Sequence, residues 1–138
     1  MKVSSPSSRD IDQLLAFVPH LKALGGQYIV DWGGGTKQPN GVFLLPWPNY
    51  PDVVEKFFEA AGEDCWWHVG YVPADAGEMV RNEAFIAGAS LAQIRTMLTW
   101  CVRGERFCDG HWAKVLEDGT VYSLLRRLEH LREQGASR

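Results

Sequence analysis

The sequence has 138 residues, 46% of them apolar and 22% charged, so it is long enough for one folded domain and too apolar for a disordered chain. The net charge of -3 argues against a dedicated nucleic-acid binder, whose affinity depends mostly on the neutralisation of phosphates. Residues 1–89 carry six Lys/Arg and eleven Asp/Glu, whereas residues 90–138 carry eight Lys/Arg and six Asp/Glu. Only the C-terminal third therefore has an excess of positive charge that favours a local anion site.

The first predicted element is a helix over Ser8–Leu24, with Ser7 or Ser8 as its N-cap. Its apolar residues recur at helical spacing. Pro19 lies inside this pattern and should kink the helix, because proline removes a backbone donor and clashes with the preceding turn. The pair Gly25–Gly26 then ends it.

A β-hairpin is predicted next, with strands at Gln27–Trp32 and Gly41–Leu45 and a polar loop over residues 33–40 between them. Glycines beside Lys37 suggest a phosphate-binding loop, but the order of residues differs from the Walker pattern and a second strand follows. A plain hairpin is therefore favoured.

The proline-rich segment that follows, residues 46–51, is predicted to be a stiff crossover, because each proline biases its predecessor away from helix. We expect Trp47 and Tyr50 to fill the core from this segment, in preference to a polyproline-type peptide ligand. In the stretch Glu63–Gly77, which has no clear assignment, Trp66 and Trp67 should point in opposite directions, so at least one should lie near the surface.

Five more helices are predicted from apolar periodicity and capping residues. They cover Pro51–Ala61, Ala76–Ala87 (capped by Asp75), Ser90–Val102, His111–Leu116 and Val121–Arg132. The expected fold is α+β and mostly α: five or six helices packed around a small antiparallel β-hairpin. We expect a single domain over residues 1–138, with loose ends at residues 1–7 and 134–138.

The stretch Leu98–Trp112, LTWCVRGERFCDGHW, concentrates the chemically active side chains. Arg103, Glu105 and Arg106 lie close to Asp109, and arginines bind phosphate or carboxylate groups well. The same four residues can instead neutralise one another as a structural network between two helices, which is the favoured interpretation.

Cys101, Cys108 and His111 in the same stretch suggest two further sites. Their spacing differs from the close ligand pairs of a structural zinc site, and free cysteines in apolar helices are usually buried. A nucleophile pair of Cys108 and His111 lacks an evident third group to orient the imidazole. We therefore predict no metal, no cofactor and no catalytic residue.

A helix-turn-helix is a weaker alternative, formed by Ser90–Val102 and His111–Leu116. The connector between them is longer than the usual three or four residues, and the second helix carries only Lys114 as a basic group.

Three cysteines cannot all pair, and their flanks resemble core and helix, unlike the disulfide framework of a secreted protein. Residues 1–10 lack the apolar run of a signal peptide, and no segment approaches the roughly 20 apolar residues that span a bilayer. We expect a cytoplasmic protein that does not enter a membrane.

Three elements of the sequence carry a family resemblance: the Leu-Thr…Val-Arg-Gly-Glu-Arg-Phe-x-x-Gly motif, the PWPNYPDVVEKFF connector and the C-terminal Leu-Leu-x-Arg-Leu. With them the chain resembles, over Val42 to Leu131, a family of small uncharacterised bacterial proteins, a domain of unknown function. The resemblance implies a bacterial or bacteriophage setting and supplies no activity.

These observations favour a non-enzymatic, bacterial or phage-encoded domain that binds a protein partner, because aromatic and arginine side chains are enriched at interface hot spots. One specific hypothesis within this class is an inhibitor of a host defence complex, such as an anti-CRISPR protein. The alternatives are a small enzyme or ligand-binding protein with an Arg/His anion site, and a DNA-binding regulator; nucleic acid is the less favoured partner. The candidate partner-binding or anion-binding residues are Arg103, Glu105, Arg106, Trp66, Trp67, His68 and His111.

Overall fold

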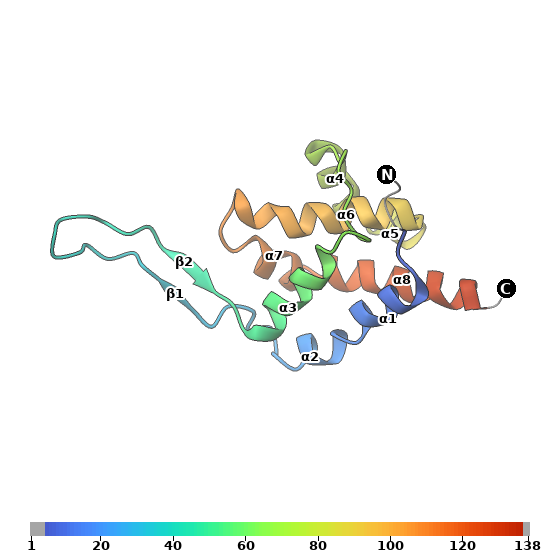
Figure 1. Cartoon of the computed structure of the whole chain (residues 1–138), viewed down its shortest axis with the longest axis horizontal. Coiled ribbons are helices and arrows are strands. Elements are labelled where there is room, and N and C mark those ends of the chain that lie inside the picture. Colours follow the sequence, from blue (N-terminus) through green and yellow to red (C-terminus); the bar gives the residue numbers. More distant parts are fainter. Residues whose placement is uncertain (1–4, 137–138) are drawn as a thin grey trace.

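The computed structural model describes residues 5–136, which form eight α-helices, one 3-10 helix and one two-stranded antiparallel sheet. The helices make one body, and the sheet belongs to a hairpin that projects from it (Figure 1). The elements are α1 (Ser8–Leu15), α2 (Val18–Lys22), β1 (Asp31–Gly33), β2 (Trp47–Asn49), α3 (Asp52–Ala61), α4 (Pro73–Val80), α5 (Glu83–Ala87), α6 (Leu91–Arg103), η1 (Gly104–Arg106), α7 (His111–Glu117) and α8 (Thr120–Ala136). The α+β, mostly α class is confirmed. No helix of the described part is both long and apolar enough to cross a membrane.

The N-terminal helix follows its local signals. Ser7 forms a capping box with Asp10, in which each side chain accepts a hydrogen bond from the other residue's backbone amide. Pro19 lies in the first turn of α2, so the predicted kink is a full break between α1 and α2. Of the ends predicted to be loose, residues 1–4 and 137–138 lie outside the described residues, whereas Ser7 caps a helix and α8 continues to Ala136.

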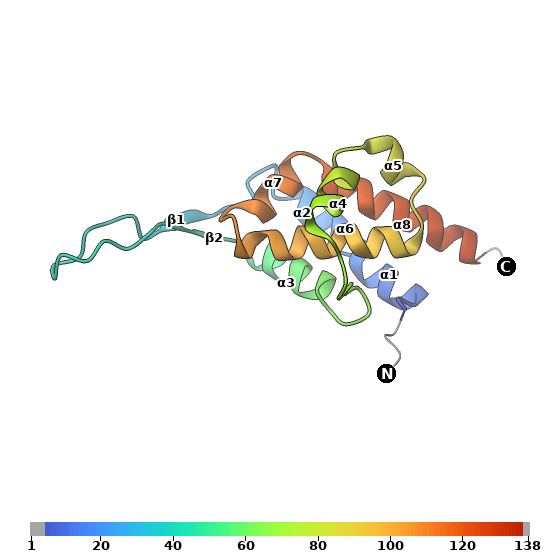
Figure 2. The same ribbon diagram turned by 90° about the horizontal axis from the view of Figure 1, so that it is seen from above.

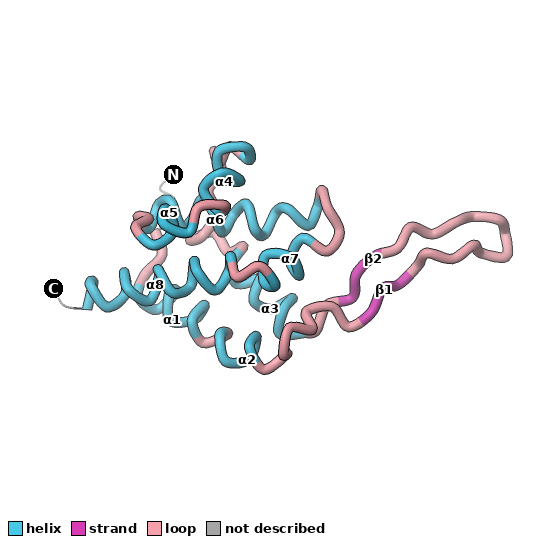
Figure 3. Tube along the Cα trace, turned by 180° about the vertical axis from the view of Figure 1, so that it is seen from behind, coloured by secondary structure: helices cyan, strands magenta, loops and turns pink. Residues whose placement is uncertain are grey.

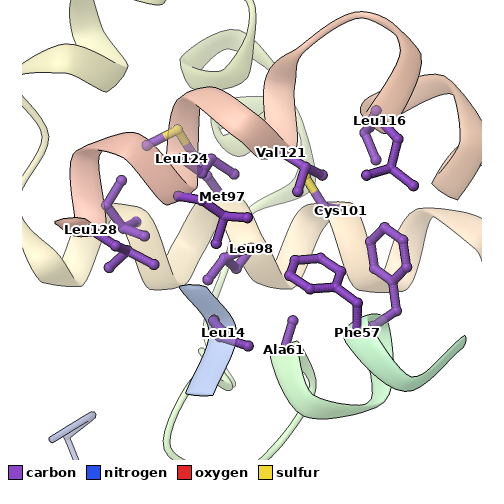
Figure 4. Close-up of a cluster of buried hydrophobic side chains, with 14 of the residues drawn as sticks. Leu14, Phe57, Ala61, Met97, Leu98, Cys101, Leu116, Val121, Leu124 and Leu128 are labelled. Atoms are coloured by element: carbon purple, nitrogen blue, oxygen red, sulfur yellow. The ribbon is translucent and has the colours of Figure 1, made fainter. Parts of the chain in front are cut away.

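The core lies where α6 and α8 run side by side and meet α1, α3 and α7 (Figure 2). Apolar side chains from all five helices converge there (Figure 4). Each fully buried side chain contributes about 1.5–3 kcal/mol relative to an exposed one. Ser90 starts α6 with a second capping box, to Gln93, as its position predicts. The labelled core residues are Leu14, Phe57, Ala61, Met97, Leu98, Cys101, Leu116, Val121, Leu124 and Leu128.

The single helix predicted over Ala76–Ala87 is wrong in two respects. The structure has two short helices, α4 and α5, and α4 begins at Pro73 with no side-chain cap from Asp75. The break falls at Asn82, whose backbone is extended (φ -117°, ψ 99°) and whose side chain accepts a hydrogen bond from the Phe85 amide. Asn82 is thus the N-cap of a new helix, which interrupts the apolar periodicity.

The hairpin strands differ from the predicted ones. The pairs Asp31–Asn49 and Lys37–Phe43 keep one register, and backbone hydrogen bonds join the two sides of the hairpin within the stretch predicted to be a loop, although the ladder is interrupted at Gly34 and Gly35. The chain reverses only at Gln38–Gly41, where the Gly41 amide donates to the Gln38 carbonyl and Gly41 has φ +88°. The strands are regular near the body only (Figure 3). We call residues 30–49 the arm.

The sequence suggested that the helices pack around this hairpin. In the structure the arm instead points away from the helical body (Figures 1 and 2). Trp47 therefore does not fill the core: its ring lies on Gly33 and Gly34 within the arm, and it is 45% exposed. Both glycines are required there, since a side chain at either position would overlap the Trp47 ring. Tyr50, just after the arm, does pack against the core, as predicted.

Candidate functional site

One carboxylate, that of Glu105, holds the turn between α6 and α7. It accepts hydrogen bonds from the Tyr50 hydroxyl at 2.8 Å and from the Gly110 and Trp112 amides at 2.9 Å each. Two of these donors lie at the N-terminus of α7, where amides have no partner within the helix and a negative charge is favourable. Burial, together with the bond to Glu105, raises the pKa of Tyr50 well above its ordinary value. Glu105 therefore caps α7 and ties it to the residue that follows β2.

The two arginines of the turn have different surroundings. The Arg103 guanidinium lies 4.9 Å from the centroid of the Trp67 ring, a cation–π contact, and its Nε is buried without an acceptor among the described residues. Arg106 is exposed. The described residues contain no ion pair within this turn, so the four charges of Arg103, Glu105, Arg106 and Asp109 do not form the mutually neutralising network favoured from the sequence.

The segment Trp66–His68 is a turn that packs on two threonines of α6. The His68 Nδ1 lies 2.7 Å from the Thr96 Oγ1, and the His68 amide donates to the Thr99 Oγ1 at 3.1 Å. Trp66 is buried in the core, whereas Trp67 is partly exposed, so one of the two tryptophans does lie near the surface, as predicted.

His111, the first residue of α7, is buried and meets the Trp100 ring edge-to-face at a centroid distance of 4.7 Å. Its imidazole lies directly against Gly104, where any side chain would overlap it. Burial lowers the pKa of His111, which favours the neutral form of the imidazole. Its Nε2 is buried with no hydrogen-bond partner among the described residues.

The cysteines of the turn do not form a reactive pair with His111. Cys101 is fully buried, and burial raises the pKa of its thiol, so it stays protonated and packs as an apolar residue. Cys108 is exposed, and no hydrogen bond joins it to His111 in the described part of the chain.

The arm carries an unusual apolar surface. Ten large apolar side chains are exposed among the described residues, and seven of them lie on the arm. They are Val30, Trp32, Val42, Phe43, Leu44, Leu45 and Trp47. Since isolated exposed apolar residues are ordinary but clusters mark interaction sites, the arm is the main candidate binding surface.

The base of the arm is fixed to the turn. The Trp32 ring lies against Gly110, and the Tyr50 ring packs on Trp112 at a centroid distance of 5.2 Å. Trp112 in turn stacks on Phe58 of α3, with centroids 4.6 Å apart and an interplanar angle of 6°. These contacts give the arm a rigid base on the helical body, and the turn between α6 and α7 faces the side from which the arm projects (Figure 1).

The structure brings Arg103 and Trp67 together but does not gather all the predicted site residues at one place. Glu105 and His111 are engaged in packing, and Trp67 lies under Arg103 away from the arm's tip. Arg106 and Asp109 are the exposed charges of the turn, and Phe107, next to Arg106, is the most exposed large apolar residue described, at 79%.

Sequence reasoning missed the binding surface of the arm. It assigned Phe43 and Leu45 to a strand of a plain hairpin, and it gave Phe107 no role. The available signal was the uninterrupted apolar run Val42–Leu45, which does not alternate with polar residues as a strand with one solvated face does. It also missed Arg95, whose Nη2 donates to the Trp67 carbonyl at 3.0 Å.

Comparison with known proteins gives one match. A family model described as "Family of unknown function (DUF6508)" matches residues 6–134. No curated protein and no solved structure matches the chain.

Proposed function

This chain belongs to the DUF6508 family, and we propose from its structure that it is a protein-binding domain whose binding element is the arm. The observation that carries the proposal is the set of seven exposed large apolar side chains on a hairpin that projects from the body (Figure 3). Exposed apolar surface of this extent is unfavourable in water, and a partner that covers it gains that free energy on binding.

The area of the arm suits a specific interface. Its seven side chains are about half exposed, and aliphatic and aromatic residues of this size expose roughly 100 Å² each under those conditions, or about 700 Å² in total. A standard protein–protein interface covers about 800 Å² on each partner. The arm thus supplies most of one side of an interface, and Arg106 and Phe107 at its base extend it.

The composition of the arm indicates the chemistry of the partner. Asp31 and Lys37 are its only charged residues, so the partner should offer an apolar concave surface. An acidic group opposite Arg106 would complete the rim. Pro46 and Pro48 lack amide donors, which disfavours the pairing of a partner strand with β2, so we expect contact through the side chains of the arm.

The test removes two exposed apolar side chains from the arm and compares the effect on binding with that of removing two exposed apolar side chains elsewhere. The arm variant is Phe43→Ser with Leu45→Ser, and the matched control is Val69→Ser with Val72→Ser, two exposed apolar residues outside the arm. Loss of roughly 100 Å² per side chain corresponds to about 2.5 kcal/mol each, so the arm variant should bind at least about a hundredfold more weakly.

The partner is first captured with the tagged chain from nuclease-treated bacterial lysate, and its affinity is then measured with both purified proteins. We expect the wild-type chain and the control to bind equally and the arm variant to lose binding. A partner that binds the arm variant as tightly as the wild-type chain would refute the proposal. An inhibitor of a bacterial defence complex is the narrowest form of the proposal, supported if the captured partner belongs to such a complex.

A further inference from the structure

A second surface lies apart from the arm, in a cavity of about 630 Å³ that we call the bowl. The α4–α5 connection, α6, α7 and the start of α8 enclose it, and Trp100 and His111 form part of its wall. Cavities of roughly 300–1,000 Å³ with a few converging polar groups are typical small-molecule sites. The size of the bowl therefore suits a metabolite better than a protein segment.

One face of α7 lines the bowl. His111, Lys114, Val115 and Asp118 all line it, and their spacing places them on the same side of a helix. The opposite wall contributes Arg81, whose guanidinium lies with the Trp100 indole beside Gly77 of α4. Two cations from different helices thus border a single cavity.

These two cations lack carboxylate partners. Neither Arg81 nor Lys114 makes an ion pair in the described part of the chain, although Glu83 and Asp118 line the same cavity. The Asp118 carboxylate is engaged instead with the Thr120 amide at 3.0 Å, where it caps the start of α8. Arg81 and Lys114 are therefore free to contact a ligand, and Glu83 and Asp118 bring two negative charges to the same cavity.

Residues with hydroxyl groups, which bind phosphate well, line the bowl as well. Thr120 and Ser123 line the bowl with their hydroxyl groups, and the N-terminal end of α8, a helix of 17 residues, borders it. The amide end of a long helix favours an anion, and phosphate oxygens accept hydrogen bonds from hydroxyls, guanidinium and ammonium groups.

His111 forms a packed part of the wall of the bowl. It is buried, its imidazole meets the Trp100 ring edge-to-face, and its Nε2 lies against Gly104, which does not line the cavity. Trp100 is therefore held in place on this side of the bowl.

A neighbouring cavity of about 270 Å³ shares Glu83, Ile86 and Ser123 with the bowl. Arg126, Arg127 and His130 of α8 line it. Cationic side chains therefore continue from the bowl along α8, which leaves room for a ligand longer than a single phosphate.

We propose that the bowl binds a small molecule that carries a phosphate group, with the phosphate held by Arg81, Lys114 and the start of α8. An apolar or aromatic part of the ligand packs against Trp100. This site does not depend on the proposed function of the arm.

The test is a titration of the full chain with inorganic phosphate and with phenyl phosphate at constant ionic strength, followed by amide and indole NMR shifts. We expect shifts at Lys114, Asp118–Ser123 and the Trp100 indole, and tighter binding of phenyl phosphate because its ring contacts Trp100. Arg81→Gln with Lys114→Gln should weaken binding by about tenfold or more, because two charge-assisted contacts are lost.

The matched control is Arg9→Gln with Lys56→Gln, which removes the same charge from exposed positions outside the bowl. Equal weakening in the control, shifts spread over the basic surface, or no shift at tens of millimolar phosphate would each overturn the proposal. If the double glutamine variant does not fold, Ser123→Glu replaces it; this variant places a carboxylate in the bowl and should abolish the phosphate shifts.

Discussion

The replacement of Glu105 by alanine is the sharpest test of how the turn between α6 and α7 is built. Among the described residues, the change removes the one acceptor of the Tyr50 hydroxyl and of the Gly110 and Trp112 amides. Hydrogen bonds to a charged group contribute about 1.5–3 kcal/mol each. Since the site is only partly buried, water can reach some of the released donors, and we expect a total loss of about 3 kcal/mol rather than the full sum.

This loss is a large share of the free energy of unfolding of a domain of this size, which is typically about 5–15 kcal/mol. The assay is urea denaturation followed by circular dichroism, with calorimetry to confirm a fall in Tm of roughly 10 °C. Arg106→Ala, a change at an exposed neighbour, is the control and should alter stability by no more than about 0.5 kcal/mol. Combined with Tyr50→Phe, the alanine variant should show a coupling of about 1–2 kcal/mol in a double-mutant cycle.

The result that would refute this reasoning is a Glu105→Ala chain whose stability matches that of Arg106→Ala. If such a chain also lost the partner, Glu105 would be a binding residue and its three hydrogen bonds would be incidental.

Three further outcomes follow from buried groups. Gly104→Ala should lower the free energy of unfolding by about 2 kcal/mol, because the new side chain overlaps the His111 imidazole. When His111→Ala is added to the same chain, the total loss should be smaller than the sum of the two single losses. Additive losses in denaturation experiments would contradict this. Because burial lowers the pKa of His111, the unfolded chain takes up a proton first, so stability should fall as the pH drops below about 6.5, and His111→Gln should remove this part of the pH dependence. Tyr28→Phe removes the 2.8 Å bond to the Tyr122 hydroxyl and should lower stability by about 1 kcal/mol, measured in urea; no change would mean that water replaces the bond.

The helical part of the fold was predictable because its signals are local. Ser7 and Ser90 cap the helices that their positions predict, and Pro19 breaks the first of them. Each signal depends on residues within one turn of the chain. Asn82 shows the limit of this reasoning: it carries an equally local cap signal, but apolar spacing on both sides concealed it.

The contacts of the turn were not predictable from its own residues. The sequence places Arg103, Glu105 and Arg106 together and suggests that they interact. In the structure Glu105 bonds to Tyr50, which lies 55 positions away, and Arg103 stacks on Trp67. A cluster of charged residues in the sequence shows which groups are close along the chain, but the partner of each side chain depends on the tertiary fold.

The exposure of the arm was hidden for a different reason. An apolar run such as Val42–Leu45 is typical of a buried strand, and hydrophobicity alone cannot distinguish burial in the chain's own core from burial against a partner. The glycines at 33 and 34 were read as flexible loop residues, although their absent side chains make room for Trp47. The arm's projection is thus a property of the folded chain.

The two proposed sites meet at α7. Its N-terminal amides are held by Glu105 together with the base of the arm, and the face with His111 and Lys114 lines the bowl. Phe43, near the tip of the arm, makes no contribution to either arrangement. Phe43→Ser should therefore weaken partner binding and leave the phosphate shifts unchanged, whereas Glu105→Ala loosens α7 and should weaken both. A Glu105→Ala chain that loses partner binding but keeps full phosphate affinity would show that the bowl is held by α4, α6 and α8 without the help of this capping carboxylate.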